Sequence, residues 1–179
     1  EDDATFQEIA HRMQASVTAW QGGIRATGGA IVPEKSHWYL IDFVWTHGHW
    51  RYATEAETPA QISVQDSTGT EKMLERLAPD EARRTLGVRL APDGNCDDQF
   101  KFMVNVATEW GEHIRTGHLP RHLVWESMHT TILRTLLYPL PATTLSQKQC
   151  HQIMAPILKY GLPCAGIVRM MPRDLVHGP

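Results

Sequence analysis

The spacing of apolar residues changes once along this chain, near residue 95, and that change limits the folds open to it. Before it, short segments rich in aromatic and β-branched residues alternate with turn residues, as in strands and hairpins. From Asp97 onward, apolar residues recur every three or four positions, as on the buried face of a helix. We therefore predict an α+β region over residues 1–95, followed by an all-helical, bundle-like region over residues 96–179.

One helix is predicted before the strands. Thr5 and Glu8 have the spacing of a capping box, in which each side chain satisfies a free backbone amide at a helix start. Gly22 and Gly23 are typical of a helix end. Apolar residues at helical spacing predict one buried face, formed by Phe6, Ile9, Ala10, Met13, Val17 and Trp20.

The strand-like segments are predicted to form antiparallel hairpins. Residues 37–45 form the first strand, which turns back through Thr46-His47-Gly48-His49 into residues 50–52. Residues 62–65 and 72–75 flank a second turn, and residues 84–90 form one further strand.

Three helices are predicted in the second region: from Asp97 to about residue 114, from Arg121 to Leu137, and from Ser146 to about residue 160. Ser146 and Gln149 form a capping box for the third, Pro156 is expected to kink it, and Gly161 to end it. Because no repeat or flexible linker separates the two regions, the change near residue 95 is interpreted as one within a compact unit.

Composition excludes several classes of protein. With 42% hydrophobic and 21% charged residues, the 179-residue chain is globular in type. No apolar run approaches the roughly 18 residues of a membrane span, so no membrane partner is expected. The cysteines are odd in number and far apart, at Cys96, Cys150 and Cys164, which predicts free thiols and an intracellular location, in cytoplasm or nucleus. Residues 1–96 carry a net charge of −5 and residues 97–179 carry +2, which favours the second region for phosphate contacts.

Few residue patterns indicate a catalytic or metal site. Asp2-Asp3 is interpreted as favourable charge at a helix start rather than a metal site. His47 and His49, with His37, have a spacing that metal sites use, but a solvated hairpin turn is the competing interpretation. Arg115, His118, Arg121 and His122 cluster between two predicted helices, and the tryptophans and methionines at helical spacing are interpreted as core residues.

Six segments together resemble the reverse transcriptases of eukaryotic retroelements. These are Trp20–Ile41, Arg84–Gly94, Arg115–Pro120, Tyr138–Leu145, Ile153–Leu158 and Pro172–Pro179. Their order is similar to the part of such RNA-directed DNA polymerases that follows the metal-binding hairpin of the palm. The resemblance implies that residues 1–95 are the C-terminal part of a palm and that residues 96–179 are a helical thumb.

The resemblance also implies roles for individual residues. Lys35 matches a loop lysine that assists the departure of pyrophosphate as a general acid. Residues 86–88, Leu-Gly-Val, match a strand that supports the primer end. The thumb-like region, with Arg115, His118, Arg121 and His122, is expected to contact the phosphates of an RNA/DNA primer–template duplex.

The aspartates that bind Mg²⁺ in this family have no counterpart here. We therefore expect Mg²⁺ in a parent enzyme, no cofactor for this chain alone, and an isolated chain that is inactive. Glu1 is not an initiator methionine and Val176–Pro179 closes no helix or strand, so we expect an internal piece whose partners include the rest of the polymerase. Two alternatives stay open: a non-catalytic interaction module from a decayed element, and a histidine-based metal-binding protein.

Overall fold

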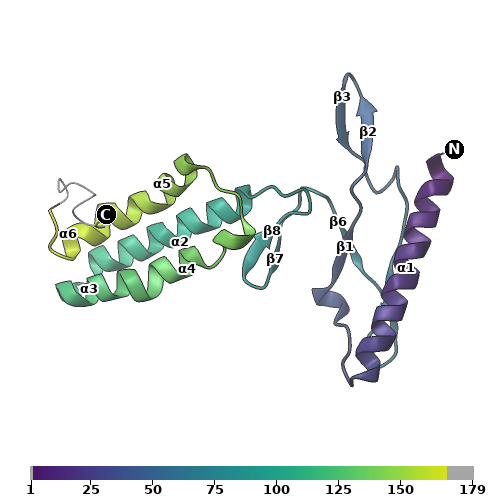
Figure 1. Cartoon of the computed structure of the whole chain (residues 1–179), viewed down its shortest axis with the longest axis horizontal. Coiled ribbons are helices and arrows are strands. Elements are labelled where there is room, and N and C mark those ends of the chain that lie inside the picture. The colour runs from purple at the N-terminus through teal and green to yellow at the C-terminus, as the bar shows by residue number, and fades with distance from the viewer. Residues whose placement is uncertain (1, 169–179) are drawn as a thin grey trace. The chain divides into compact units, whose positions relative to one another are not determined.

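The structure is a computed structural model that describes the backbone of residues 2–168 and the side chains of residues 8–168 (Figure 1). The described residues form helices and short strand pairs, which confirms the α+β class. The chain forms two compact units, residues 1–81 and residues 82–179. The predicted change to helix does come at Asp97, but the units divide at Glu81 and Ala82, before the last hairpin.

Helix α1 spans Asp2–Ala26 and is longer at both ends than predicted. Thr5 lies inside the helix, so its predicted role as a cap is wrong. Gly22 and Gly23 also lie inside, and the helix ends only before Gly28, which has a φ of +80°. The amide of Gly28 donates to the Arg25 carbonyl at 2.9 Å and that of Gly29 to the Ile24 carbonyl at 3.0 Å, as in a Schellman motif.

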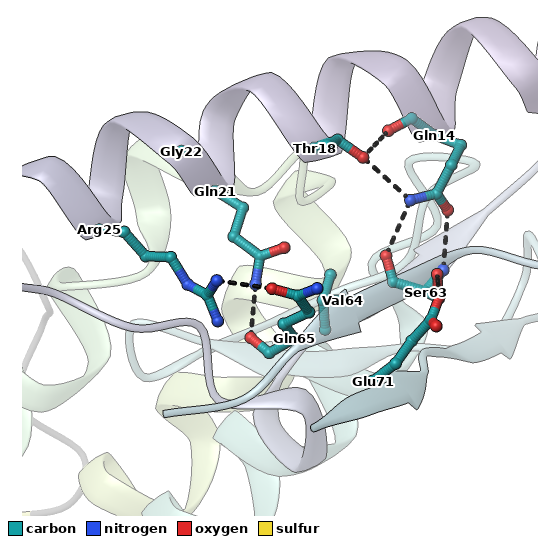
Figure 2. Close-up of a pocket in the computed structure, with 9 residues that line it drawn as sticks. All are labelled: Gln14, Thr18, Gln21, Gly22, Arg25, Ser63, Val64, Gln65 and Glu71. Carbon is teal, nitrogen blue, oxygen red and sulfur yellow. Dashed lines mark hydrogen bonds between the residues drawn. The ribbon is translucent and has the colours of Figure 1, made fainter. Parts of the chain in front are cut away.

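The buried face of α1 agrees with the prediction in part, since Ala10, Met13 and Val17 are half-buried. Ile9 and Trp20 are 43% and 66% exposed, whereas the polar Gln21 is buried. The Gln14 amide donates to the Ser63 carbonyl at 3.0 Å and accepts from the Ser63 amide at 2.8 Å (Figure 2). Gln21 donates to the carbonyl of Gln65. Side-chain amides therefore attach α1 to a strand edge, on the same face as these half-buried apolar residues.

Six strands follow in the first unit: β1 (His37–Tyr39), β2 (Phe43–Thr46), β3 (His49–Tyr52), β4 (Ser63–Gln65), β5 (Glu71–Met73) and β6 (Glu75–Leu77). The antiparallel pairs β2–β3 and β4–β5 confirm both predicted hairpins. The predicted strand over residues 37–45 is two strands, because the chain leaves the extended pairing at residues 40–42. β1 also pairs in parallel with β6, a pair that the predicted hairpins did not include.

The second unit contains the predicted helices. α2 spans Asp97–Thr116, and one helical stretch from Arg121 to Leu137 comprises α3 (Arg121–Ser127), a π turn (Met128–Ile132) and α4 (Leu133–Leu137). After a short 3-10 turn at Leu140–Ala142, another stretch comprises α5 (Gln147–Pro156), a π turn (Ile157–Gly161) and α6 (Leu162–Cys164). These helices share one core, formed by Met103, Ala107, Met128, Ile132, Leu136, Ile153 and Ile157.

The ends of the last helical stretch illustrate two local signals. The predicted capping box of Ser146 and Gln149 is present at the start of α5. Pro156 is followed by the π turn, where the regular hydrogen-bond ladder of the helix is interrupted as expected of an internal proline. Gly161 does not end the helix but lies inside it, where a Cβ would lie 3.0 Å from the Trp110 ring. The helix ends instead before Gly166, which has a φ of +85°.

A hairpin precedes α2 and packs against it. β7 (Arg83–Thr85) and β8 (Val88–Leu90) replace the single strand predicted over residues 84–90. The buried side chain of Gln99 in α2 accepts a hydrogen bond from the Arg89 amide at 2.7 Å. This contact explains why the hairpin belongs to the helical unit.

Membrane-spanning helices and disulfides were both predicted to be absent, and both concern the described part of the chain. No helix within residues 2–168 has the length and apolar character needed to cross a bilayer. Cys96, Cys150 and Cys164 are unpaired, as predicted. The resembling segment at residues 172–179 and the side chains of Asp2, Asp3, Thr5 and Phe6 lie outside the described residues.

Candidate nucleic-acid interface

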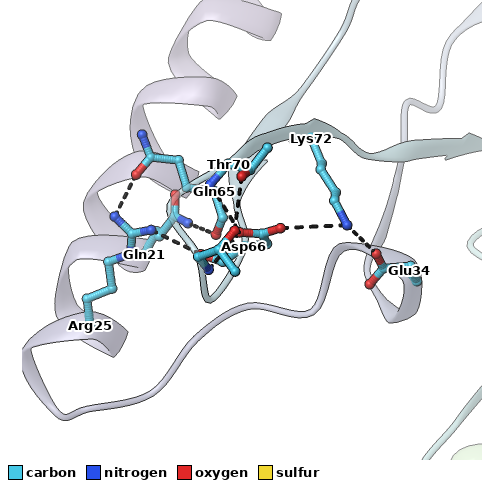
Figure 3. A network of polar contacts seen from close by, with 8 residues as sticks. Gln21, Arg25, Glu34, Gln65, Asp66, Thr70 and Lys72 are labelled. Carbon is cyan, nitrogen blue, oxygen red and sulfur yellow. Dashed lines mark hydrogen bonds and ion pairs between the residues drawn. The ribbon is translucent and has the colours of Figure 1, made fainter.

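Lys35 lies at the end of a short 3-10 helix, Pro33–Lys35, with an exposed side chain. The residue before it anchors this loop: Lys72 of β5 donates to Glu34 at 2.7 Å and lies 3.6 Å from Asp66 (Figure 3). The hydrogen bond from Lys72 lowers the pKa of Glu34, and the hydrogen bond to Glu34 raises the pKa of Lys72. The ion pair therefore ties the Lys35 loop to the β4–β5 hairpin, and the role of Lys35 as a general acid stays a prediction.

A polar cavity of about 270 Å³ lies beside the α1 attachment in the same unit. Figure 2 shows the amides of Gln14 and Gln21 and the guanidinium of Arg25 reaching from α1 towards β4. Arg25 donates to the side chain of Gln65 at 2.5 Å. Because these polar groups already bond one another across the cavity, we interpret it as part of the helix attachment rather than a substrate site.

The predicted primer-supporting residues occupy the turn of a hairpin rather than the middle of a strand. Leu86 and Gly87 are the turn residues, with φ of 49° and 90°, as in the tight turns that join two short antiparallel strands. Leu86 is 87% exposed, whereas the Val88 side chain is buried. The Leu86 and Gly87 end of the turn is thus accessible to a ligand, and the side chain of Val88 is core.

Tyr138, which was not among the predicted site residues, fixes this turn. Its hydroxyl donates to the Leu86 carbonyl at 2.8 Å. A Cβ on Gly87 would lie 3.4 Å from the Tyr138 ring. A cavity of about 320 Å³ beside the turn is lined by Arg84, Gln99, Phe102 and Tyr138, among others. In the sequence, the available signal for Tyr138 was its position, directly between the end of a predicted helix and a proline.

The predicted basic cluster lies at the C-terminal end of α2, and the β7–β8 hairpin packs near its N-terminal end. Arg115 lies in the last turn of α2, and His118, Arg121 and His122 lie in the following loop and the first turn of α3; all four are exposed. The Arg115 guanidinium lies 5.9 Å from the centre of the Tyr160 ring. The Arg121 stem passes Gly166, where a Cβ would lie 2.9 Å from its Cδ. These contacts restrict both arginines while their charges stay in water.

Two aromatic contacts extend the basic cluster. Trp125 and His129, one turn apart on the α3 side, meet edge to face with ring centres 4.7 Å apart. Lys159 lies 4.9 Å from the centre of the Tyr160 ring. The spacing of His122, Trp125 and His129 at i, i+3 and i+7 was a signal in the sequence for one shared helix face.

The division into units sharpens the charge asymmetry seen in the sequence. Residues 1–81 hold 6 Lys and Arg against 13 Asp and Glu, a net charge of −7, and residues 82–179 hold 11 against 7, a net charge of +4. The hairpin arginines Arg83, Arg84 and Arg89 fall on the positive side of this division. A positive helical unit is the better candidate for contact with phosphates.

Metal ligands do not gather in the described residues. No three His, Cys, Asp or Glu side chains there lie close enough to form a metal-binding group, so His37, His47 and His49 do not make one. His37 pairs with Glu75 in the β1–β6 pair, whereas His47 and His49 belong to the β2–β3 hairpin. No Mg²⁺ site is assigned within this part of the chain.

The chain matches no protein-family model, no curated protein and no solved structure.

Proposed function

We propose that this chain is the C-terminal palm and thumb segment of a retroelement reverse transcriptase, and that its helical unit holds primer–template nucleic acid through phosphate contacts. The observation that carries the proposal is the net charge of +4 on residues 82–179, together with the exposed cluster of Arg115, His118, Arg121 and His122. Exposed arginines that are restricted by neighbouring groups are suited to phosphate oxygens, because less side-chain entropy is lost on binding.

Two parts of the helical unit are candidate contacts for the duplex, the β7–β8 turn and the basic cluster, and the length of α2 separates them. The 20 residues of α2 extend about 30 Å, with the β7–β8 hairpin packed near the first turn and the basic cluster at the last. At about 3.4 Å per phosphate along one strand, a duplex touching both would extend over about nine phosphates. Two contacts about nine phosphates apart support recognition of the duplex by its phosphates and shape rather than by its base sequence.

Lys35 belongs to the same proposal but acts only in the complete enzyme. In that setting its ammonium would donate a proton to the departing pyrophosphate, and the Glu34–Lys72 ion pair would position its loop. The isolated chain is expected to bind nucleic acid without copying it.

The proposal is tested by binding a fluorescent RNA/DNA hybrid of about 16 base pairs to the full chain between 50 and 200 mM salt. We expect log K to fall linearly with log salt concentration. Replacing Arg115 and Arg121 with Gln should weaken binding and reduce the magnitude of the slope by about 2, since each phosphate contact contributes about 0.9.

The matched control replaces Lys101 and Lys148 with Gln, which removes the same charge from two exposed positions outside the cluster. This variant should keep the larger slope. Absence of binding at low salt would overturn the proposal and favour the interaction module. Equal slopes for the two double variants would show that the cluster is not the phosphate site.

A further inference from the structure

The cavity of about 320 Å³ beside the β7–β8 turn has the size and wall of a small-molecule site. Residues of the hairpin, of α2 and of α4 line it, all within the second unit. Its volume falls in the range of about 300–1,000 Å³ that is usual for such sites, which have an apolar wall and a few polar groups. The apolar part of the wall includes Phe102, Met103, Val106 and Leu136.

One buried polar group of the wall lacks a hydrogen-bond partner. Gln99 is 1% exposed, and its side-chain oxygen accepts from the Arg89 amide at 2.7 Å. Because a backbone amide can donate only to the oxygen, this bond also fixes where Nε2 of Gln99 lies. Within the described residues, Nε2 donates to no other group. Since buried amide groups are nearly always hydrogen-bonded, we expect an oxygen acceptor in the cavity beside Gln99.

The remaining polar groups of the wall indicate that this acceptor is an anion. The hydroxyls of Thr135 and Tyr138 already donate to backbone carbonyls, at 2.9 Å and 2.8 Å. Arg84 is exposed and has neither an ion pair nor a hydrogen bond within the described part of the chain. None of the described residues that line the cavity is an Asp or Glu. The charge of the wall is therefore positive, and a planar guanidinium suits a carboxylate in particular.

We propose that this cavity binds a small aromatic carboxylate. The carboxylate accepts hydrogen bonds from Nε2 of Gln99 and from the guanidinium of Arg84, and the ring packs against Phe102 and Leu136. Oxygen acceptors thereby meet the two unsatisfied donors, and an apolar ring fills the apolar part of the cavity. This site goes beyond the proposed function and does not rest on it.

The test uses 2-naphthoate as the probe and the full chain as the receptor. Proton–nitrogen correlation spectra follow the side-chain amide of Gln99 while the probe is added. We expect a saturable shift of this resonance, because its protons gain a charged acceptor. The cationic analogue 2-naphthylmethylamine has the same ring system but no acceptor, and it should cause no such shift.

Arg84→Gln should weaken 2-naphthoate binding by about tenfold or more, since it removes a charge-assisted hydrogen bond. Arg84 is exposed, so its replacement should leave the fold intact. The matched control is Arg134→Gln, which removes the same charge from an exposed position of α4 that does not line the cavity. This control should bind 2-naphthoate as the unaltered chain does.

Gln99→Glu tests the buried donor. Glutamate keeps an oxygen for the Arg89 amide but replaces the two N–H donors with a second acceptor, so binding of 2-naphthoate should be lost. Three outcomes would overturn the proposal: no saturable shift of the Gln99 amide, equal affinity for 2-naphthoate and the cationic analogue, or equal weakening by the Arg84 and Arg134 replacements.

The two proposals fail separately, because the probe is added without nucleic acid. A cavity that binds no carboxylate leaves the duplex contacts of Arg115 and Arg121 standing. Hybrid binding that does not depend on these arginines removes the duplex proposal and leaves the carboxylate site standing.

Discussion

Gly111 and Gly161 allow the helices of the second unit to approach closely. A Cβ at Gly111 would lie 2.7 Å from the Tyr160 ring and 3.3 Å from the Pro156 carbonyl, and one at Gly161 would lie 3.0 Å from Trp110. Trp110 in turn donates to the Ser127 hydroxyl at 3.1 Å. Two glycines that cost helix propensity are therefore favoured here because they let α2 and the helical stretch of residues 147–164 approach closely.

Gly111→Ala is expected to destabilise the second unit by about 1–3 kcal/mol, because overpacking outweighs the gain in helix propensity. Urea unfolding followed by far-ultraviolet circular dichroism measures the change. Gly23→Ala is the matched control: it is also helical, but nothing lies within 4 Å of its Cβ, so it should stabilise α1 by about 0.5–1 kcal/mol. Stabilisation by both substitutions would contradict the close approach at Gly111.

At the scale of elements, one carboxylate holds the base of the β2–β3 hairpin. Glu57 accepts from the Arg51 guanidinium and, at 2.9 Å, from both the amide and the hydroxyl of Thr54. The hydrogen bond from Arg51 is the main reason that the pKa of Glu57 falls from its ordinary 4.5 to about 2, with Thr54 contributing further. The end of β3 is thereby tied to the turn that follows it.

The stability that Glu57 adds should depend on pH with a definite sign. Because its folded-state pKa is lower than its unfolded-state pKa, the contribution is fully present above about pH 4.5 and is lost as the pH falls through about 2. Nuclear magnetic resonance titration of the Glu57 carboxyl, with the cross-strand amides of Val44 and Arg51 as reporters, measures this. In Glu57→Gln the reporters should lose their acid transition, and a Glu57 pKa near 4.5 would contradict the ion pair.

Helix α1 shows that an element can be predicted while its orientation is not. Of its predicted apolar face, Ala10, Met13 and Val17 are half-buried, whereas Ile9 and Trp20 are exposed. The inward face also carries polar residues that bond to β4 and the turn after it, through Gln14, Gln21 and Arg25. The β7–β8 turn is a second case. Leu86 adopts a positive φ, which is uncommon for a residue other than Gly, Asn or Asp, so the local residues resembled one strand rather than a hairpin.

At the scale of the whole molecule, charge and core are divided between the two units. The buried core cluster of the helical unit comprises residues of that unit, from Met103 to Ile157, with Phe100 packed against it, and the same unit carries the net positive charge. Its shared helical core does not require a residue from the first unit, which explains why helix periodicity predicted this half well.

Residues 82–179 produced alone are therefore expected to fold and to keep the hybrid binding of the full chain. Circular dichroism should show the helical signal with cooperative thermal unfolding, and the salt dependence of hybrid binding should match that of the full chain. Residues 1–81, with a net charge of −7, should not bind the hybrid. An unfolded 82–179 fragment would show that the helical core depends on the first unit.

Local sequence determined the helices of residues 97–160, the capping box at Ser146 and the two hairpins of the first unit, because periodicity, capping and turn residues act over a few positions. The exposed basic cluster was also predictable, since its residues lie within eight positions of one another. Only the tertiary structure decided the parallel pairing of β1 with β6, the polar face by which α1 attaches, and the contact of Tyr138 with Leu86. These contacts join residues tens of positions apart, and their hydrogen bonds and packing depend on partners that no local pattern identifies.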